Sequence, residues 1–323
     1  MRIGLPKSLL YYYYYPFWAE LFEKLDLELV VSDSTSADIL NRGVKESISE
    51  ICVPMKVYIG QIFNLLDKKV DYIYIPRFVS IKKGITFCPK FLGLPDMIRN
   101  SFPEIEGKIM THHIKSNNDD ISNYDNYIYF KEIIGLSDKK IKSALEIARN
   151  KWIEYRNLQK QGYKTIELLN ENKETFNDTN KDVTIGLLGY VYNIYDNYIN
   201  MDLLSRLDEM GAKVITFDML EDNNIDNYLK KYRKKMFWEF TNKLLGAGHF
   251  FMDRRELDGI IHVTAFGCGP DSILGPFLEM EAEEKNKPFM TLRIDEQTGE
   301  SHLITRIEAF IDLLKLNKRR ERI

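Results

Sequence analysis

The sequence predicts a protein of two α/β domains, each built on a parallel β-sheet, with a helical arm between them. Three observations predict this class. Short apolar runs alternate with longer amphipathic segments over residues 1–114 and again over 183–323, as strands and helices alternate in parallel sheets. Residues 115–182 differ, because they are rich in Lys and Glu and end in a polar run. The length of 323 residues also suits two domains better than one.

The first domain, predicted over residues 1–114, opens with a strand. Short apolar runs bounded by turn residues indicate strands at 2–5, 28–32 and 72–76. Amphipathic spacing indicates helices at 18–24, 36–44 and 57–66. Ser36 is expected to be the N-cap of the second helix, because its hydroxyl can accept a bond from a helix N–H.

The second domain, predicted over residues 183–323, repeats this alternation. Its strands are expected at 183–189, 213–217, 257–261 and 289–294. Its helices are expected at 201–210, 232–245, 272–285 and 301–314. Between the two domains, residues 115–182 are predicted to form a helical arm followed by a polar linker.

Composition is typical of a soluble globular protein, with 44% hydrophobic and 29% charged residues. The net charge of −3 provides no basic field for nucleic acid, and the Lys/Arg clusters at 230–235 and 318–322 are expected to be solvated. No run approaches the roughly 20 apolar residues of a membrane helix, and the first residues resemble a strand rather than a signal peptide. We therefore expect a cytoplasmic protein that binds neither nucleic acid nor membrane.

Three cysteines occupy predicted loops. Cys52 lies in Glu-Ile-Cys-Val-Pro-Met-Lys before a helix, Cys88 lies in Phe-Cys-Pro-Lys, and Cys268 lies in Gly-Cys-Gly-Pro-Asp-Ser after a strand. Each is next to a proline or two residues from one. An odd number of cysteines in such a chain argues against a disulfide framework.

In open parallel sheets the loops after the strands meet at one edge, where ligands bind. Three thiolates at this edge would suit a soft metal, although no CxxC pair indicates a zinc ribbon or a thioredoxin motif. A cubane iron–sulfur cluster takes four ligands, usually cysteines, so three leave one iron open to water or substrate. A free cysteine is also commonly a small buried apolar residue, and the residues alone leave both interpretations open.

Five segments together resemble the 2-hydroxyacyl-CoA dehydratase-related family, in particular its small activase-associated members. They lie at 2–16, 50–56, 87–96, 267–272 and 294–300, and the resemblance covers nearly the whole chain except the arm. In that family, cysteines on two flavodoxin-like (Rossmann-like) domains hold an iron–sulfur cluster between them. The resemblance therefore implies that Cys52, Cys88 and Cys268 bind a [4Fe–4S] cluster as its metal ligands.

The resemblance also implies partners and an activity. An ATP-dependent activase of the ASKHA type would supply low-potential electrons, and a related dehydratase subunit could be a second partner. The chain has neither a phosphate-binding P-loop nor a G-x-G-x-x-G motif, so ATP use would belong to the activase. The implied activity is low-potential electron transfer or reduction in an anaerobe. Two alternatives stay open: a non-catalytic accessory protein that docks on an activase or larger enzyme, and a structural zinc or thiol protein.

Other polar residues follow predicted strands, and no catalytic residue is assigned among them. Asp295 and Glu296 form a carboxylate pair that could transfer protons. The tyrosine-rich loop at 190–196 resembles a family segment and could line the cleft or pack against the arm. Asp96 and Asp271 are expected to cap helices.

Overall fold

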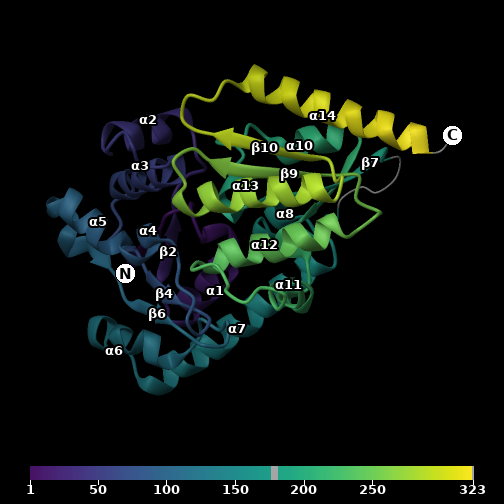
Figure 1. Ribbon diagram of the computed structural model, residues 1–323. Helices are drawn as coiled ribbons and strands as arrows, with labels where there is room; N and C mark the ends of the chain where they lie inside the picture. The colour runs from purple at the N-terminus through teal and green to yellow at the C-terminus, as the bar shows by residue number, and fades with distance from the viewer. Residues whose placement is uncertain (176–180, 322–323) are drawn as a thin grey trace. The chain divides into compact units, whose positions relative to one another are not determined.

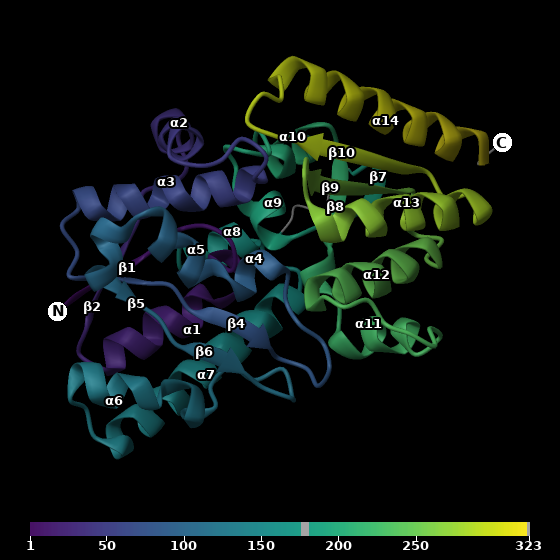
Figure 2. The same cartoon turned by 60° about the vertical axis from the view of Figure 1, so that its left-hand side comes forward.

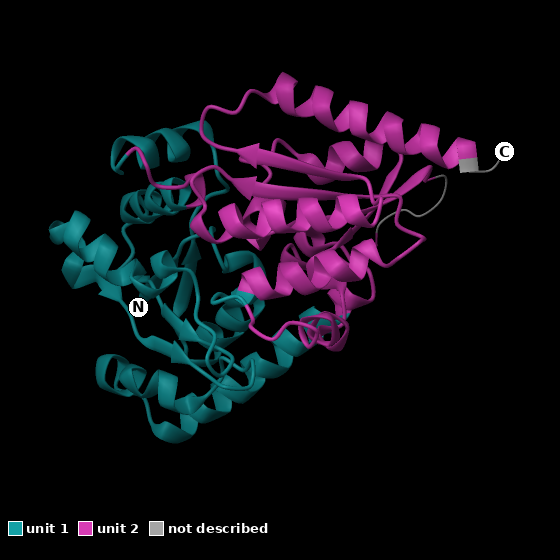
Figure 3. Ribbon diagram, in the orientation of Figure 1, with its two compact units in different colours: residues 1–48, 55–157, 236–239 teal, residues 49–54, 158–235, 240–323 magenta. Residues whose placement is uncertain are grey.

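The structure, a computed structural model, describes residues 1–175 and 181–321 (Figure 1). The chain forms two compact units (Figure 3). The first unit consists of Met1–Ile48, Met55–Asn157 and Met236–Glu239, and the second of Ser49–Pro54, Leu158–Lys235 and Phe240–Ile323. Each unit contains a four-stranded parallel sheet with helices, which confirms the predicted fold class.

The sheet of the first unit has the order β2-β1-β3-β5, with all neighbours parallel. Its strands are β1 (Arg2–Leu5), β2 (Glu28–Val31), β3 (Tyr72–Tyr74) and β5 (Ile109–Met110). A separate parallel pair joins β4 (Arg77–Ser80) to β6 (His113–Lys115). The strand order reverses direction between β1 and β3, as in flavodoxin-like folds.

The helices of the first unit begin with α1 (Tyr11–Lys24) and α2 (Ala37–Lys45). Ser36 is the N-cap of α2 as predicted, because its hydroxyl accepts a hydrogen bond from the Ile39 N–H. The other helices are α3 (Val53–Asp67), α4 (Pro89–Leu92), α5 (Leu94–Ser101), α6 (Ile128–Ile134) and α7 (Asp138–Lys160). Two 3-10 helices, η1 (Pro103–Lys108) and η2 (Tyr124–Tyr127), lie between them.

A run of five tyrosines forms the first turns of α1, which therefore begins at Tyr11 rather than at residue 18. Four of the five rings are buried. The backbone oxygens of Tyr13 and Tyr12 accept hydrogen bonds from Trp152 Nε1 and the Tyr155 hydroxyl of α7. The aromatic run is therefore core, and it ties α7 to α1.

Helices α2 and α3 touch through glycine. A Cβ atom on Gly43 would lie 1.8 Å from the backbone oxygen of Lys56, and one on Gly60 would lie 2.0 Å from that of Ile39. Such distances are far inside van der Waals contact. The two backbones therefore approach at a separation that only glycine permits.

The sheet of the second unit has the order β10-β9-β7-β8, again parallel throughout. Its strands are β7 (Val183–Gly189), β8 (Ala212–Thr216), β9 (Gly259–Ala265) and β10 (Phe289–Ile294). Every residue of β9 is buried. This central strand has neighbours on both sides and helices over its faces, as parallel sheets require.

The second unit has seven helices in its described residues, and Figure 2 shows α13 beside β9 and α14 beside β10. They are α8 (Thr165–Leu169), α9 (Val191–Tyr195), α10 (Leu203–Glu209), α11 (Asp222–Leu229), α12 (Glu239–Met252), α13 (Gly269–Glu284) and α14 (Glu300–Glu321), with one 3-10 helix, η3 (Phe217–Met219). Among the described residues, no helix is both long enough and apolar enough to cross a membrane.

Two further predicted boundaries were wrong. Helix α12 begins at Glu239 and not at residue 232, because residues 236–239 pair with the first unit instead. There the Thr86 N–H donates to the Phe237 oxygen, and the Glu239 N–H donates to the Thr86 oxygen, both at 2.9 Å. Strand β9 begins at Gly259 and extends through Ala265, so His262 lies inside the strand rather than in the following turn.

The predicted arm is divided between the units. Residues 115–157 belong to the first unit and the residues from 158 onward to the second. The part of the predicted linker at 176–180 lies outside the described residues. The domain boundaries at 114 and 182 stay a prediction.

Candidate functional site: three cysteines at helix starts

Each of the three cysteines directly precedes a helix. Cys52 comes immediately before α3, whereas Cys88 and Cys268 are the N-cap residues of α4 and α13. A proline follows each cysteine within the first two helical positions. Proline suits these positions because its fixed φ is helical and the missing N–H has no partner there. The cysteine–proline contexts seen in the sequence are therefore helix-start signals.

The helix starts shape the electrostatics around the sulfur atoms. The first N–H groups of a helix have no partner within it and carry partial positive charge, which stabilises anions. Neither α4 nor α13 has a side-chain hydrogen bond at its N-cap. All three cysteines have intermediate exposure. A partly exposed cysteine beside helix N–H groups is a type of ligand that suits a soft metal or an iron–sulfur cluster.

The segments of Cys52 and Cys268 belong to the same unit. Ser49–Pro54 belongs to the second unit, and a Cβ atom on Gly267 would lie 3.7 Å from the backbone oxygen of Glu50. Gly267 has φ of +73°, a conformation that glycine adopts without strain. This turn directs the chain from β9 into the N-cap residue Cys268.

Cys88 belongs to the first unit, where the residues before it are held firmly. Thr86 is paired with Phe237 on the backbone, as described above. The ring of Phe87 packs with Phe78 of β4 and with Phe91 of α4, at centroid distances of 5.1 and 6.2 Å. The backbone pairing and the aromatic contacts fix the chain on both sides of Cys88.

Asp96 does not cap a helix, contrary to the prediction. Its carboxylate accepts a hydrogen bond from Arg77 at 2.7 Å, and the same guanidinium donates to the Leu92 oxygen at 2.7 Å. The N-cap position of α5 is Gly93, without a side-chain bond. Arg77 thus ties β4 to the end of α4, the short helix that Cys88 starts.

Asp271 does not cap α13 either. Its side chain is 1% exposed and faces His262 of β9, with Oδ2 3.6 Å from Nε2. Among the described residues, no hydrogen bond reaches either carboxylate oxygen or either ring nitrogen. A Cβ atom on Gly275 would lie 3.5 Å from Cε1 of His262, so α13 passes directly over the ring. The available sequence signal was a histidine next to a run of apolar residues, Ile260 and Ile261.

The loop at 190–196 packs inside the second unit. The Tyr195 hydroxyl donates to both oxygens of Asp218, at 2.8 and 2.9 Å, and Gln159 Nε2 donates to the same carboxylate at 3.0 Å. Burial, together with the Asp218 carboxylate, raises the pKa of Tyr195 well above its ordinary value. The Tyr190 hydroxyl lies 2.9 Å from Thr241 Oγ1. These contacts favour packing inside the protein over lining a cleft.

The carboxylate of Asp295 closes a turn. It accepts from the Gln297 N–H at 2.8 Å and from the Thr298 hydroxyl at 2.9 Å. Asp commonly bonds the backbone two residues onward in this way. Asp295 therefore has a local structural role at the end of β10.

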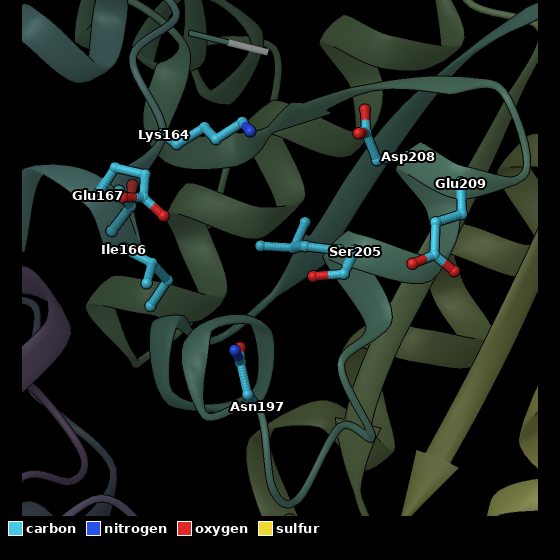
Figure 4. Close-up of a pocket in the computed structure, with 9 residues that line it drawn as sticks. Lys164, Ile166, Glu167, Asn197, Ser205, Asp208 and Glu209 are labelled. Carbon is cyan, nitrogen blue, oxygen red and sulfur yellow. The ribbon is translucent and has the colours of Figure 1, made fainter. Parts of the chain in front are cut away.

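A surface pocket of about 220 Å³ lies between α8 and α10 in the second unit. Figure 4 shows Lys164 and Glu167 facing Ser205 and Asp208 across it. Asp208 is held by Lys181 at 2.6 Å. No cysteine lines this pocket, so it is separate from the predicted cluster ligands.

Within residues 1–175 and 181–321, no three His, Cys, Asp or Glu side chains form a metal-binding group. The cysteines are divided, with Cys88 in the first unit and Cys52 and Cys268 in the second. The ligand set of Cys52, Cys88 and Cys268 therefore stays a prediction.

Comparison with known proteins gives a family match and matches to solved structures. No curated protein matches the chain. A solved structure of SirB from Bacillus subtilis with Fe3+ is 8% identical, with 98% of this chain and 96% of that chain covered, but its TM-score is 0.22. That score is too low to relate the two folds. A family model described as the CoA enzyme activase uncharacterised domain matches residues 2–220, a range that contains Cys52 and Cys88 but not Cys268. The match confirms the activase-associated resemblance, and the chain belongs to this CoA enzyme activase-related family.

Proposed function

We propose that the chain is an iron–sulfur protein that works with an ATP-dependent activase in low-potential electron transfer. In this proposal Cys52, Cys88 and Cys268 hold a [4Fe–4S]-type cluster. The observation that carries the proposal is that all three cysteines are partly exposed and directly precede helices. Membership in an activase-related family supports the choice of partner.

The residues of the chain would bind and orient the cluster. The three sulfur atoms are its ligands, and the helix N–H groups behind them stabilise its negative charge. Gly267 shapes the turn before Cys268, and Arg77 anchors the helix that follows Cys88. When bound, such a cluster supplies one-electron chemistry at low potential.

Metal analysis of anaerobically purified protein tests the proposal. We expect brown protein with about four iron and about four sulfide per chain. Cys52→Ser, Cys88→Ser and Cys268→Ser should each lower the iron content. Ser272→Ala is the matched control, because it alters the turn of Cys268 without removing a sulfur atom. Full iron in any of the three cysteine variants would exclude that cysteine from the ligand set.

Two further outcomes separate the alternatives. Colourless protein that contains zinc would replace this proposal with a structural zinc or thiol protein. A cluster that forms but accepts no electron from reduced activase would favour a non-catalytic accessory protein. The electron transfer is measured by the electron paramagnetic resonance signal that this protein's cluster gains after mixing with reduced activase and ATP.

A further inference from the structure

A basic pocket lies at the edge of the second unit's sheet where the strands begin, opposite the edge that carries Cys268. Its volume is about 820 Å³, within the range of roughly 300–1,000 Å³ typical of small-molecule sites. Its lining comes from the residues just before β9 and β10, from the ends of α12 and α14, and from Lys285 and Asn286 just after α13. Figure 1 shows the end of α14 beside the beginning of these strands.

Six cationic side chains and two carboxylates line this pocket, a net charge of +4. Both carboxylates are already engaged. Asp253 pairs with Lys285 at 2.5 Å, and Asp258 pairs with Lys318 at 2.9 Å. The other four cations are Arg254, Arg255, Lys287 and Arg320.

The negative ends of helix dipoles offset only part of this positive charge. Three helices end at the pocket, and each C-terminus carries about −0.5 of an elementary charge, which basic side chains commonly offset. The three ends therefore contribute about −1.5 in total. Glu256 outside the pocket lies 3.8 Å from Arg254 and removes one further positive charge. The pocket remains positive after both corrections.

The cations differ in how firmly they are held. The Arg254 guanidinium lies 4.3 Å from the centre of the Phe250 ring, and Lys287 Nζ donates to the backbone oxygens of Arg254 and Leu257. Arg255 and Arg320 are exposed, and in the described part of the chain neither forms an ion pair. The pocket thus combines two positioned cations with two guanidinium groups available to a ligand.

We propose that this pocket binds a small soluble ligand that carries two or three linked phosphates. Guanidinium groups match phosphate oxygens in a two-pronged geometry, which favours phosphate over a single carboxylate. A chain of phosphates carries about two to four negative charges near neutral pH, opposite in sign to the positive charge that remains. The site shares no residue with the predicted cluster ligands, so it does not depend on the proposed function.

Calorimetric titration of the whole protein with inorganic tripolyphosphate tests this inference. We expect saturable binding that weakens as salt rises, and weaker binding of orthophosphate at equal ionic strength. Arg255→Gln and Arg320→Gln should each lower the affinity by about tenfold. Arg319→Gln is the matched control, because it removes the same charge from the same turn of α14 but does not line the pocket. It should change the affinity less than about twofold.

Each result supports or overturns the site. Adenosine triphosphate that competes with tripolyphosphate extends the ligand class to phosphate chains on a nucleoside, and failure to compete restricts it to inorganic chains. Absence of tripolyphosphate binding by the wild-type protein overturns the inference. Equal losses of affinity in Arg319→Gln and Arg320→Gln also overturn it, because they indicate attraction by the overall positive charge of this surface rather than by the pocket. Tighter binding of an oligonucleotide at equal phosphate concentration would assign the surface to nucleic acid instead. Thermal unfolding of the unliganded variants checks that their folds are intact.

Discussion

Nε2 of His262 lies 3.6 Å from Oδ2 of Asp271, and both side chains are almost completely buried. His262 is in the central strand β9, and Asp271 is in the first turn of the helix that begins after Cys268. A buried charge is costly unless it is paired. Each of these two groups therefore depends on the other, and together they join the helix start to the sheet.

Removing one member of this pair should cost more than removing both. We expect His262→Leu to lower the free energy of unfolding by about 3–5 kcal/mol, because it leaves a buried carboxylate without a partner. Asp271→Leu should cost about 1–3 kcal/mol, since it removes the carboxylate that faces the buried imidazole. The double variant should fall within about 1 kcal/mol of the wild type or be more stable. Urea unfolding of all four proteins measures the cycle, and strictly additive losses would show that the two side chains do not interact.

The stability of the first unit should fall in acid because of His112. This ring is buried, with Nε2 2.7 Å from the Tyr74 hydroxyl, and burial lowers its pKa from 6.5 to about 4. Between pH 6.5 and about 4, the His112 ring is protonated in the unfolded chain but neutral in the folded chain. Stability is therefore lost as the pH falls from 6.5 to about 4, by at most about 3 kcal/mol.

Two variants isolate this effect of His112. His112→Gln should flatten the dependence of the unfolding free energy on pH over this window, because the amide does not titrate. His302→Gln removes an exposed histidine on α14 and should leave the slope unchanged. An unchanged slope in His112→Gln would assign the acid sensitivity to other groups. Urea unfolding at a series of pH values provides the measurement.

Gly43→Ala should destabilise the first unit, although alanine is the better helix former by about 1 kcal/mol. The added Cβ atom would lie 1.8 Å from the Lys56 oxygen, so α2 and α3 must separate. We expect a net loss of about 1–3 kcal/mol in the free energy of unfolding. Gly107→Ala is the control, because nothing lies within 4 Å of its added Cβ. Equal unfolding midpoints for the two variants would argue against the close helix contact.

Gly267→Ala should disturb Cys268 more than Gly269→Ala does. Gly267 has φ of +73°, whereas Gly269 has no positive φ and open space around an added Cβ. The strained alanine should cost about 1 kcal/mol or more. If Cys268 is a cluster ligand, the Gly267 variant should also retain less iron after anaerobic purification. Equal iron content in both glycine variants would show that the turn geometry at Gly267 does not affect cluster binding.

The sequence by itself determined the local structure of this protein. Apolar runs predicted seven of the eight strands of the two four-stranded sheets, all but the two-residue β5, and the hydroxyl of Ser36 caps α2 as expected. The prolines after the three cysteines lie at the first or second position of a helix, where a fixed φ and a missing N–H are tolerated. The activase-associated family could also be recognised from short segments.

Only the tertiary structure decided which distant residues meet. Residues 236–239 looked helical but pair with Thr86, because backbone hydrogen bonds from another segment outweigh a weak local propensity. His262 faces Asp271, and Arg320 shares a pocket with Arg255, although the basic run near the C-terminus looked like a solvated tail. Periodicity reports which face of an element is apolar, whereas the partner of that face depends on how separate elements pack.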